Sequence, residues 1–381
     1  MPAGRWLSGA AALAVSIAPA LAGPVSFDAL PGWATDDHAA AFAAFHEACG
    51  AVLERPAAAA SGPADPAALA TACRAARALP PDPGRAAARR FFEARFRPER
   101  VGAADGGFLT GYFEPELRGS RRRHGRFRVP LYRLPDDVVA VSAAAGLDPA
   151  LTHARRRADG ALEPYPDRAA IEAGALAGRG LEIVWLADPV DAFFAHVQGS
   201  VRVRLDDGAV VRLGFAGRNG RPYTPIARRL IERGEIARED MTAERLAAWL
   251  RAHPDEAPAL MAENPSYIFF REIDGLAAGH GPVGALGVPL TPGRSLAVDP
   301  AALPLGVPVF LDGTLPLGAG GAPVAVHRLV VAADTGAAIR GPGRGDLFVG
   351  TGAAAGRAAG RLRHPVDFVV LVPRPEAGDG R

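Results

Sequence analysis

The sequence predicts a mixed fold, mainly β with several α-helices. Up to residue 96 apolar residues recur at helical spacing, and beyond Gly106 the apolar runs become short and are broken by glycine and proline. The chain has 381 residues, of which 49% are hydrophobic and 22% are charged. This composition is typical of a globular protein with one large core or two moderate ones.

The N-terminal residues 1–22 have the pattern of a Sec-type signal peptide. Arg5 precedes an apolar stretch from Leu7 to Ile17, and Ala20-Leu21-Ala22 forms a cleavage site before Gly23. The apolar stretch is too short to cross a bilayer comfortably. The residue directly after the cleavage site, which is acylated in a lipoprotein, is Gly23 and not a cysteine. We therefore expect an exported, periplasmic protein.

The helical part begins near Asp36, which with Asp37 is a suitable helix cap. Over 36–53 the residues Phe42, Phe45 and Cys49 lie at spacings of three and four, which places them on one helix face. Two further helices are expected over 66–78 and 85–96.

Cys49 and Cys73 are the only cysteines of the chain. Because an exported protein meets oxidising conditions, the two are expected to pair and to tie the first helix to the second. Two free buried thiols are the alternative.

Short strands and helices alternate between residues 108 and 252. The clearest signal is a hairpin, in which 201–205 and 210–215 flank the turn dipeptide Asp207-Gly208. The other expected strands are 108–112, 129–133 and 182–186, and the expected helices are 167–174, 190–196, 224–233 and 242–252.

The last third of the chain predicts a small barrel. Several short strands separated by frequent turns suit a closed antiparallel or mixed sheet. The expected strands are 267–272, 295–298, 307–311, 329–333 and 368–372.

Several kinds of chemistry lack a sequence signal. There is no Cys/His cluster at metal-ligand spacing, no glycine-rich phosphate loop and no Gly-x-Ser-x-Gly elbow, and the 9 histidines are scattered. We therefore expect no metal and no cofactor. The net charge is only +2 and the charges are interspersed, which argues against a nucleic-acid partner.

Carboxylates are the remaining candidates. The apolar run 330–333 leads to Asp334, and a glycine-rich turn then brings back Asp346 beside Leu347 and Phe348. Apolar neighbours desolvate a carboxyl group and favour its protonated form, which a general acid needs. Aspartates beside glycine also make turn hydrogen bonds, and spacing alone favours neither interpretation.

The order of several motifs along the chain decides between a catalytic role and a turn-forming role for these aspartates. The chain resembles the membrane-bound lytic murein transglycosylase A family, with its C-terminal three-aspartate (3D) domain, from about Leu30 to Pro373. The motifs that carry the resemblance are Leu109–Pro115, Val197–Ser200, Gly217–Gly220, Asn264–Tyr267, Ser295–Pro300, Pro304–Gly306, Asp334–Gly336 and Arg344–Phe348.

The resemblance implies a double-psi β-barrel domain with N-terminal helices, and a smaller inserted β-rich domain, with a glycan groove between them. After the signal peptide 1–22, the expected division of the chain is 23–112 for the N-terminal helices and first barrel strand, 113–235 for the inserted substrate-binding domain, 236–374 for the rest of the barrel and 375–381 for a tail.

The resemblance also implies roles for single residues. Asp346 falls on the family's catalytic aspartate, with Asp334 and Asp299 as supporting carboxylates. Residues expected to line the groove are Thr110, Gly111, Tyr112, Gln198, Ser200, Arg218, Asn219 and Tyr223. The sequence departs from the family pattern at Phe113 and Phe215, where tyrosine is usual, and at Val201 and Ala337, where glycine is usual.

The implied activity is cleavage of peptidoglycan glycan strands between N-acetylmuramic acid and N-acetylglucosamine, with formation of 1,6-anhydromuramic acid ends. The alternatives are a peptidoglycan hydrolase on the same fold, a non-catalytic glycan-binding module, and a scaffold role in a cell-wall synthesis or division complex. Family members are often attached to the outer membrane. We expect a monomer.

Overall fold

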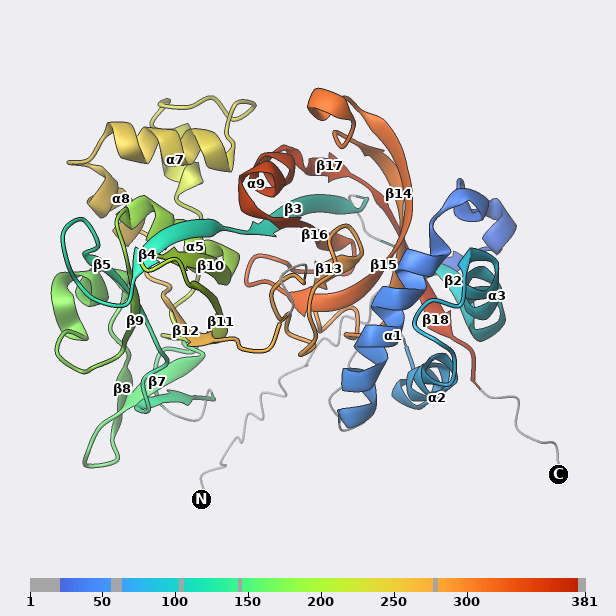
Figure 1. Cartoon of the computed structure of the whole chain (residues 1–381), viewed down its shortest axis with the longest axis horizontal. Helices are drawn as coiled ribbons and strands as arrows, with labels where there is room; N and C mark the ends of the chain where they lie inside the picture. Colours follow the sequence, from blue (N-terminus) through green and yellow to red (C-terminus); the bar gives the residue numbers. More distant parts are fainter. Residues whose placement is uncertain (1–20, 56–63, 103–105, 143–145, 277–279, 376–381) are drawn as a thin grey trace, which may run out of the picture.

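The structure is a computed structural model that describes residues 21–55, 64–102, 106–142, 146–276 and 280–375. Three sheets account for the strands of these residues. In Figure 1 the barrel strands occupy the middle of the molecule, helices α1–α3 lie to the right, and a second sheet lies to the left. The expected signal peptide, 1–22, lies outside the described residues except for its last two positions.

The largest sheet forms the barrel and draws strands from both ends of the chain. Its central strand pairs are parallel between β13 and β15 and between β16 and β3, and antiparallel between β13 and β16. In spatial order its described strands are β1 (Leu21–Pro24), β2 (Phe96–Val101), β18 (Asp367–Pro373), β14 (Pro308–Leu315), β15 (Val324–Thr335), β13 (Ser295–Val298), β16 (Arg344–Thr351), β3 (Phe108–Glu114) and β17 (Arg363–Pro365).

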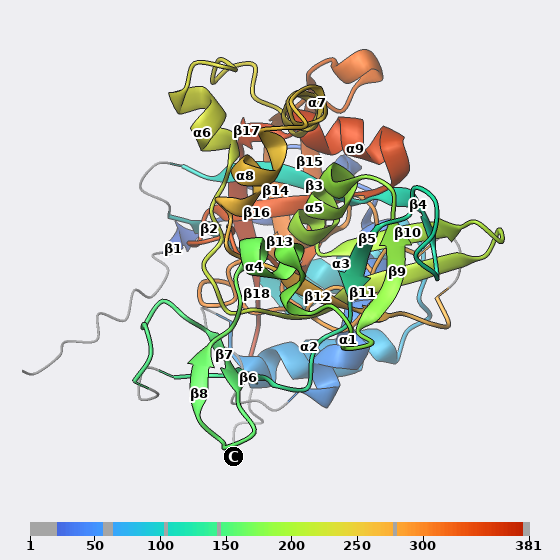
Figure 2. The same cartoon turned by 90° about the vertical axis from the view of Figure 1, so that its left-hand side faces the viewer.

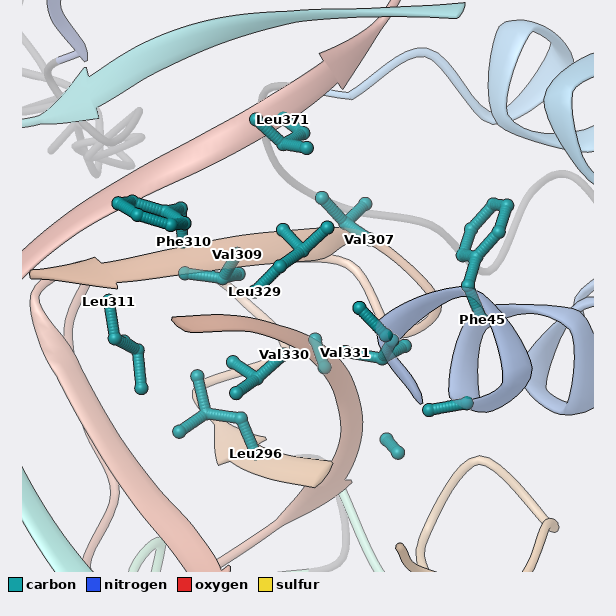
Figure 3. Close-up of a cluster of buried hydrophobic side chains, with 14 of the residues drawn as sticks. Phe45, Leu296, Val307, Val309, Phe310, Leu311, Leu329, Val330, Val331 and Leu371 are labelled. Carbon is teal, nitrogen blue, oxygen red and sulfur yellow. The ribbon is translucent and has the colours of Figure 1, made fainter. Parts of the chain in front are cut away.

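Three N-terminal helices pack against the barrel: α1 (His38–Glu54), α2 (Pro66–Arg77) and α3 (Arg85–Arg95). Asp37 caps α1 by accepting a hydrogen bond from the Ala40 amide. A disulfide joins Cys49 to Cys73 and so ties α1 to α2. Figure 3 shows Leu296, Val309 and Val330 among the barrel strands, with Phe45 on the neighbouring α1. The helices and the barrel therefore share one core.

The second sheet is six-stranded within the described residues. Its order is β12 (Ile268–Glu272), β11 (Val210–Arg218), β10 (Ser200–Leu205), β4 (Glu116–Ser120), β9 (Glu182–Leu186) and β5 (Val129–Tyr132). Because this sheet takes in β12, it extends beyond residue 235, the end of the expected inserted domain. The division of the chain into domains stays a prediction.

Smaller elements surround the second sheet. Strands β6 (Val138–Ala140), β7 (His153–Arg156) and β8 (Leu162–Pro164) form a third sheet that projects below it (Figures 1 and 2). The helices of this half are α4 (Arg168–Ala170), α5 (Pro189–Gln198), α6 (Ala227–Glu232), α7 (Ala243–Ala252) and α8 (Ala257–Ala262), while α9 (Gly352–Arg361) packs on β3 of the barrel.

A buried carboxylate joins the two large sheets. Glu114, at the end of β3, is fully buried. It accepts hydrogen bonds from the Thr351 hydroxyl of the barrel at 2.8 Å and from Arg202 of β10 at 3.3 Å. Burial raises the pKa of Glu114, and the hydrogen bond from Thr351 and the positive charges of Arg212 and Arg202 oppose that rise. One side chain thus binds both walls of the space between the sheets.

None of the helices in the described ranges combines the length and apolarity that crossing a bilayer requires.

Candidate active site

A cavity of about 690 Å³ lies between the barrel and the second sheet. The barrel contributes Tyr112, Ala297, Asp334 and Asp346 to its wall, and α5 and the second sheet contribute Gln198, Ser200, Phe215 and Arg218. Two parts of the chain that are far apart in sequence therefore face each other across one space.

The strand β13 brings the two aspartates together. It lies between β15 and β16, and Ala297 is the register partner of both Asp334 on β15 and Asp346 on β16. Residues directly opposite each other in neighbouring strands point to the same face of a sheet. Both carboxyl groups therefore reach the cavity, on either side of the small Ala297 side chain.

The surroundings of Asp346 strongly perturb the protonation of its carboxyl group. Burial raises its pKa to about 6, and the charge of Asp334 adds to the rise. The Thr110 hydroxyl donates a hydrogen bond to Asp346 Oδ1 at 2.7 Å, and this bond and the Arg344 guanidinium hold the pKa from rising further. Arg344 donates in turn to the Thr110 hydroxyl oxygen at 2.8 Å.

Asp334 has both of its oxygens engaged. The Tyr112 hydroxyl donates to Oδ2 at 2.7 Å, and the Ala285 amide donates to Oδ1 at 2.8 Å. Burial raises the pKa of Asp334, and these two hydrogen bonds oppose that rise. Burial beside Asp334 also raises the pKa of Tyr112 well above its ordinary value, so Tyr112 is a hydrogen-bond donor at neutral pH.

Asp299 does not line the cavity. Its side chain is buried and accepts hydrogen bonds from the amides of Ala301 at 3.1 Å and Gly341 at 2.8 Å, and it pairs with Arg340 at 3.7 Å. These contacts hold the loop 336–343, whose residues 336–339 line the cavity. Asp299 therefore contacts the loop but does not contact the cavity.

Most of the groove residues expected from the sequence line the cavity: Gly111, Tyr112, Gln198, Ser200, Arg218 and Tyr223. Gln198 lines the cavity, and its Oε1 accepts a hydrogen bond from the Phe113 amide at 3.2 Å. Gly111 also packs against α9, where a Cβ would lie 2.6 Å from Leu362 Cδ1. A side chain at residue 111 would therefore push α9 away from β3.

Thr110 and Asn219 lie outside the cavity wall. Thr110 acts on the site through its hydrogen bond to Asp346. Asn219 is fully buried, where its amide donates to the carbonyls of Pro166 and Pro265 and its oxygen accepts from the Tyr267 amide. Asn219 thus holds the backbone on which the cavity wall is built.

Arg168 is a further residue of the wall that the sequence did not reveal. It is 1% exposed and donates to the carbonyls of Asn264 at 3.1 Å and Ser266 at 2.8 Å. It also contacts His196 Nδ1 at 3.1 Å, and burial together with this cation lowers the pKa of His196 well below its ordinary value. The motif Asn264–Tyr267 was visible in the sequence, but its partner precedes it by 96 residues.

In the part of the chain that the structure describes, no three His, Cys, Asp or Glu side chains are grouped so as to hold a metal ion.

Two family models match the chain. The one described as the MltA specific insert domain matches residues 108–271, and the one described as the 3D domain matches residues 294–372. The first range contains the second sheet apart from the last residue of β12, together with β3, and the second contains both cavity aspartates.

Curated relatives and solved structures give the same assignment. The membrane-bound lytic murein transglycosylase A of Vibrio cholerae is 34% identical over 67% of this chain and 62% of its own length, so the chain spans less than two thirds of that relative. A membrane-bound lytic murein transglycosylase from Agrobacterium tumefaciens has 38% identity and a TM-score of 0.80, covering 92% of this chain and 97% of its own. Escherichia coli MltA with bound chitohexaose has 28% identity and a TM-score of 0.60, covering 81% of this chain and 82% of its own.

These likenesses confirm the fold class expected from the sequence, a double-psi barrel domain with N-terminal helices and an inserted β-rich domain. They extend over nearly the whole described chain and include the strands that carry Asp334 and Asp346. The chain belongs to the membrane-bound lytic murein transglycosylase A family.

Proposed function

We propose that the protein is a peptidoglycan lytic transglycosylase that uses Asp346 as its single general acid and base. It cleaves the β-1,4 bond between N-acetylmuramic acid and N-acetylglucosamine and leaves a 1,6-anhydromuramic acid end. The cavity between the barrel and the second sheet is the glycan site.

The observation that carries this proposal is the state of Asp346. A general acid works best when its pKa lies near the working pH, and burial raises the pKa of Asp346 to about 6. The carboxyl lines a cavity of about 690 Å³, which is large enough for a few sugar rings. Thr110 fixes one oxygen of the carboxyl and leaves the other to face a substrate.

The proposed reaction has two proton transfers. Protonated Asp346 donates its proton to the glycosidic oxygen as the bond from that oxygen to C1 of N-acetylmuramic acid breaks. The C6 hydroxyl of the same sugar forms a new bond to C1, and the carboxylate of Asp346 accepts the hydroxyl proton. Because the nucleophile belongs to the substrate, no water has to be bound and oriented. The aspartic acid is regenerated at the end.

Asp334 is proposed to support the reaction without exchanging a proton with the substrate. Its two oxygens are held by Tyr112 and by the Ala285 amide, so it is fixed on the other side of Ala297 from Asp346. In its ionised form it stabilises the positive charge that develops at C1, and it raises the pKa of Asp346. Asp299 supports the site through the loop 336–343.

The chitohexaose bound to Escherichia coli MltA supports the choice of ligand, because it is a β-1,4-linked chain of N-acetylglucosamine. We further propose that residues 1–22 direct export to the periplasm and that the protein acts on glycan strands as a monomer. A cell-wall synthesis or division complex is the protein partner that we propose.

The decisive experiment is digestion of purified peptidoglycan sacculi, with the released muropeptides analysed by liquid chromatography and mass spectrometry. Wild type is compared with Asp346→Asn and with Asp148→Asn, a matched control in an exposed turn. We expect anhydromuropeptides from wild type and from the control, and at least a thousandfold slower release by Asp346→Asn, since loss of a group that acts twice removes roughly two catalytic contributions.

Two outcomes would change the function assigned to the protein. Reducing ends instead of anhydro ends would make the protein a hydrolase, with Asp334 activating water. Binding of sacculi without release by any of the three proteins would indicate a glycan-binding module or a scaffold.

A further inference from the structure

Phe215 and Arg218 form a second feature of the cavity, away from the two aspartates. Both residues lie on β11 and line the cavity. Residues three apart on a regular strand point to opposite faces, because side chains alternate. A bulge between Phe215 and Gly217 resets the alternation and brings the two side chains together, with the Arg218 guanidinium 5.5 Å from the centre of the Phe215 ring.

Gly217, next to this bulge, leaves room for the Leu134 side chain. A Cβ on residue 217 would lie 2.6 Å from Leu134 Cδ1, so a larger residue there would require the Leu134 side chain to move. The register shift of the backbone itself places Phe215 and Arg218 beside each other.

The guanidinium of Arg218 has no hydrogen-bond or ion-pair partner among the residues that the structure describes, although the residue is half-buried. Arg168, also in the cavity wall, is by contrast fully engaged by two carbonyls and by Glu172 at 3.0 Å. A cation that is withdrawn from water and left without a counter-ion is unfavourable. An anionic ligand would remove that cost.

Neighbouring positive charge strengthens the argument. Burial lowers the pKa of Arg218, and Arg340 on the opposite wall lowers it further. Arg340 adjoins the cavity-lining residues 336–339, and its partner Asp299 is 3.7 Å away. His153, on β7, is also close enough for Arg218 to lower its pKa, after the larger effect of its own burial. Arg218 and Arg340 together make this end of the cavity repel cations and attract a carboxylate.

Phe215 supplies the other half of the recognition. Its side chain is 42% exposed although it is a large hydrophobic residue. An exposed aromatic face that lines a cavity is suited to the apolar face of a sugar ring, while a guanidinium is suited to two-point binding of a carboxylate.

We propose that Phe215 and Arg218 form a subsite for a sugar that carries a carboxylate, so that the cavity prefers an acidic glycan to a neutral one. This proposal rests on the proposed function, because it takes peptidoglycan as the ligand. The carboxylate has two sources in that polymer. It is the lactyl group of a peptide-free N-acetylmuramic acid, or a carboxylate of the stem peptide when the lactyl group is amidated.

The test measures binding and not cleavage, by calorimetry with the full chain carrying Asp346→Asn. Three ligands are compared: chitohexaose, a peptide-free oligomer of alternating N-acetylglucosamine and N-acetylmuramic acid, and the same oligomer with stem peptides. Each is titrated into the parent, into the parent with Arg218→Gln, and into the parent with Arg204→Gln. Arg204 is an exposed arginine of β10 that pairs with Glu116 and does not line the cavity, so it controls for the change in net charge.

We expect Arg218→Gln to weaken binding of an acidic oligomer by about 10- to 100-fold, as loss of a charge-assisted pair predicts. Binding of chitohexaose and all binding by Arg204→Gln stay within about twofold of the parent. Loss with the peptide-free oligomer identifies the lactyl carboxylate, and loss only with the peptide-bearing oligomer identifies the stem peptide.

Equal weakening of all three ligands, no weakening at all, or failure of the parent to bind either acidic oligomer would overturn the proposal. Phe215→Ala is expected to weaken chitohexaose as well, and unchanged binding of that oligomer would remove the ring from the subsite. Because no product is measured, these results are independent of whether Asp346 transfers protons.

Discussion

Thr110 and Asp346 are register partners in the neighbouring parallel strands β3 and β16, and the threonine hydroxyl donates a 2.7 Å hydrogen bond to the aspartate. Along the sequence, the strand that carries Thr110 precedes the second sheet and the strand that carries Asp346 follows it. Because the bond favours the ionised carboxylate, Thr110 controls the proton affinity of the proposed catalytic group.

The first prediction concerns Thr110→Val. A general acid must be protonated, so kcat/KM of the wild type should fall as pH rises through the Asp346 pKa of about 6. Removing the hydroxyl raises that pKa, and the fall in kcat/KM should move to higher pH by about one unit. Muropeptide release measured from pH 4 to pH 8 checks this. Thr110→Ser keeps the hydroxyl and should follow the wild-type profile, and a Thr110→Val profile displaced to lower pH would contradict the assignment.

Asp334→Asn should displace the same profile in the opposite direction. The charge of Asp334 raises the pKa of Asp346, so its removal lowers that pKa and moves the fall in kcat/KM to lower pH. Tyr112→Phe is the control, because it removes the hydrogen bond to Asp334 and leaves the charge in place. If both variants shift the profile alike, the effect is due to lost orientation and not to charge.

Asp346→Asn should make the protein more stable at alkaline pH. The folded-state pKa of Asp346 is raised from 3.8 to about 6, so the folded protein binds this proton more tightly than the unfolded chain. The ionised carboxyl therefore destabilises the fold above pH 6, by up to about 3 kcal/mol, and this effect disappears as pH falls towards 4. Urea unfolding at pH 4, 6 and 8 measures it. A free energy difference between variant and wild type that does not change with pH would count against a raised pKa.

Asp36→Ala should destabilise the protein far more than the neighbouring Asp37→Ala. Asp36 is buried, forms a two-point ion pair with Arg294 at 2.9 and 3.0 Å, and accepts from the Leu329 amide at 2.8 Å. Its loss leaves Arg294 buried without that partner, at a cost of about 3–5 kcal/mol. Asp37 is an exposed helix cap whose loss costs about 1 kcal/mol. Equal unfolding free energies for the two variants would show that the buried pair does not hold α1 to the barrel.

The parts of the fold that the sequence predicted are those with strong local patterns. The periodic apolar residues before residue 96 form α1–α3, the hairpin at Asp207-Gly208 joins β10 to β11, and 182–186 and 295–298 match β9 and β13. In these segments burial and local preference favour the same structure.

The segments that were missed have weak local patterns. In β16 the apolar residues 347–349 are flanked by glycine, arginine and aspartate, so the segment resembled a turn. Helix α9 is built mainly of alanine and glycine and packs on β3, which is distant in sequence. Glycine lowers helix propensity, and tertiary packing supplies the stability that the local sequence lacks.

The sequence predicted which residues belong to the candidate site better than it predicted the contacts between them. The motifs contained both cavity aspartates, and six of the eight residues predicted to line the groove do line the cavity. They did not distinguish Asn219, which holds backbone, from Arg218, which faces the ligand space. Nor did they pair Thr110 with Asp346, 236 residues apart, because such a contact depends on strand register in the folded barrel.

The strand order of the barrel also sets the order in which the chain can fold. Strands β2 and β3 are synthesised early, but β2 pairs with β18 and β3 with β16, near the C-terminal end of the chain. Contacts so distant in sequence form slowly, since the intervening chain must be brought back before they contribute. The second sheet, whose strands lie between residues 116 and 272, has all of its partners earlier. The two aspartates thus come together only after the last barrel strands have been made, and a chain interrupted before β16 lacks Asp346, the proposed proton donor.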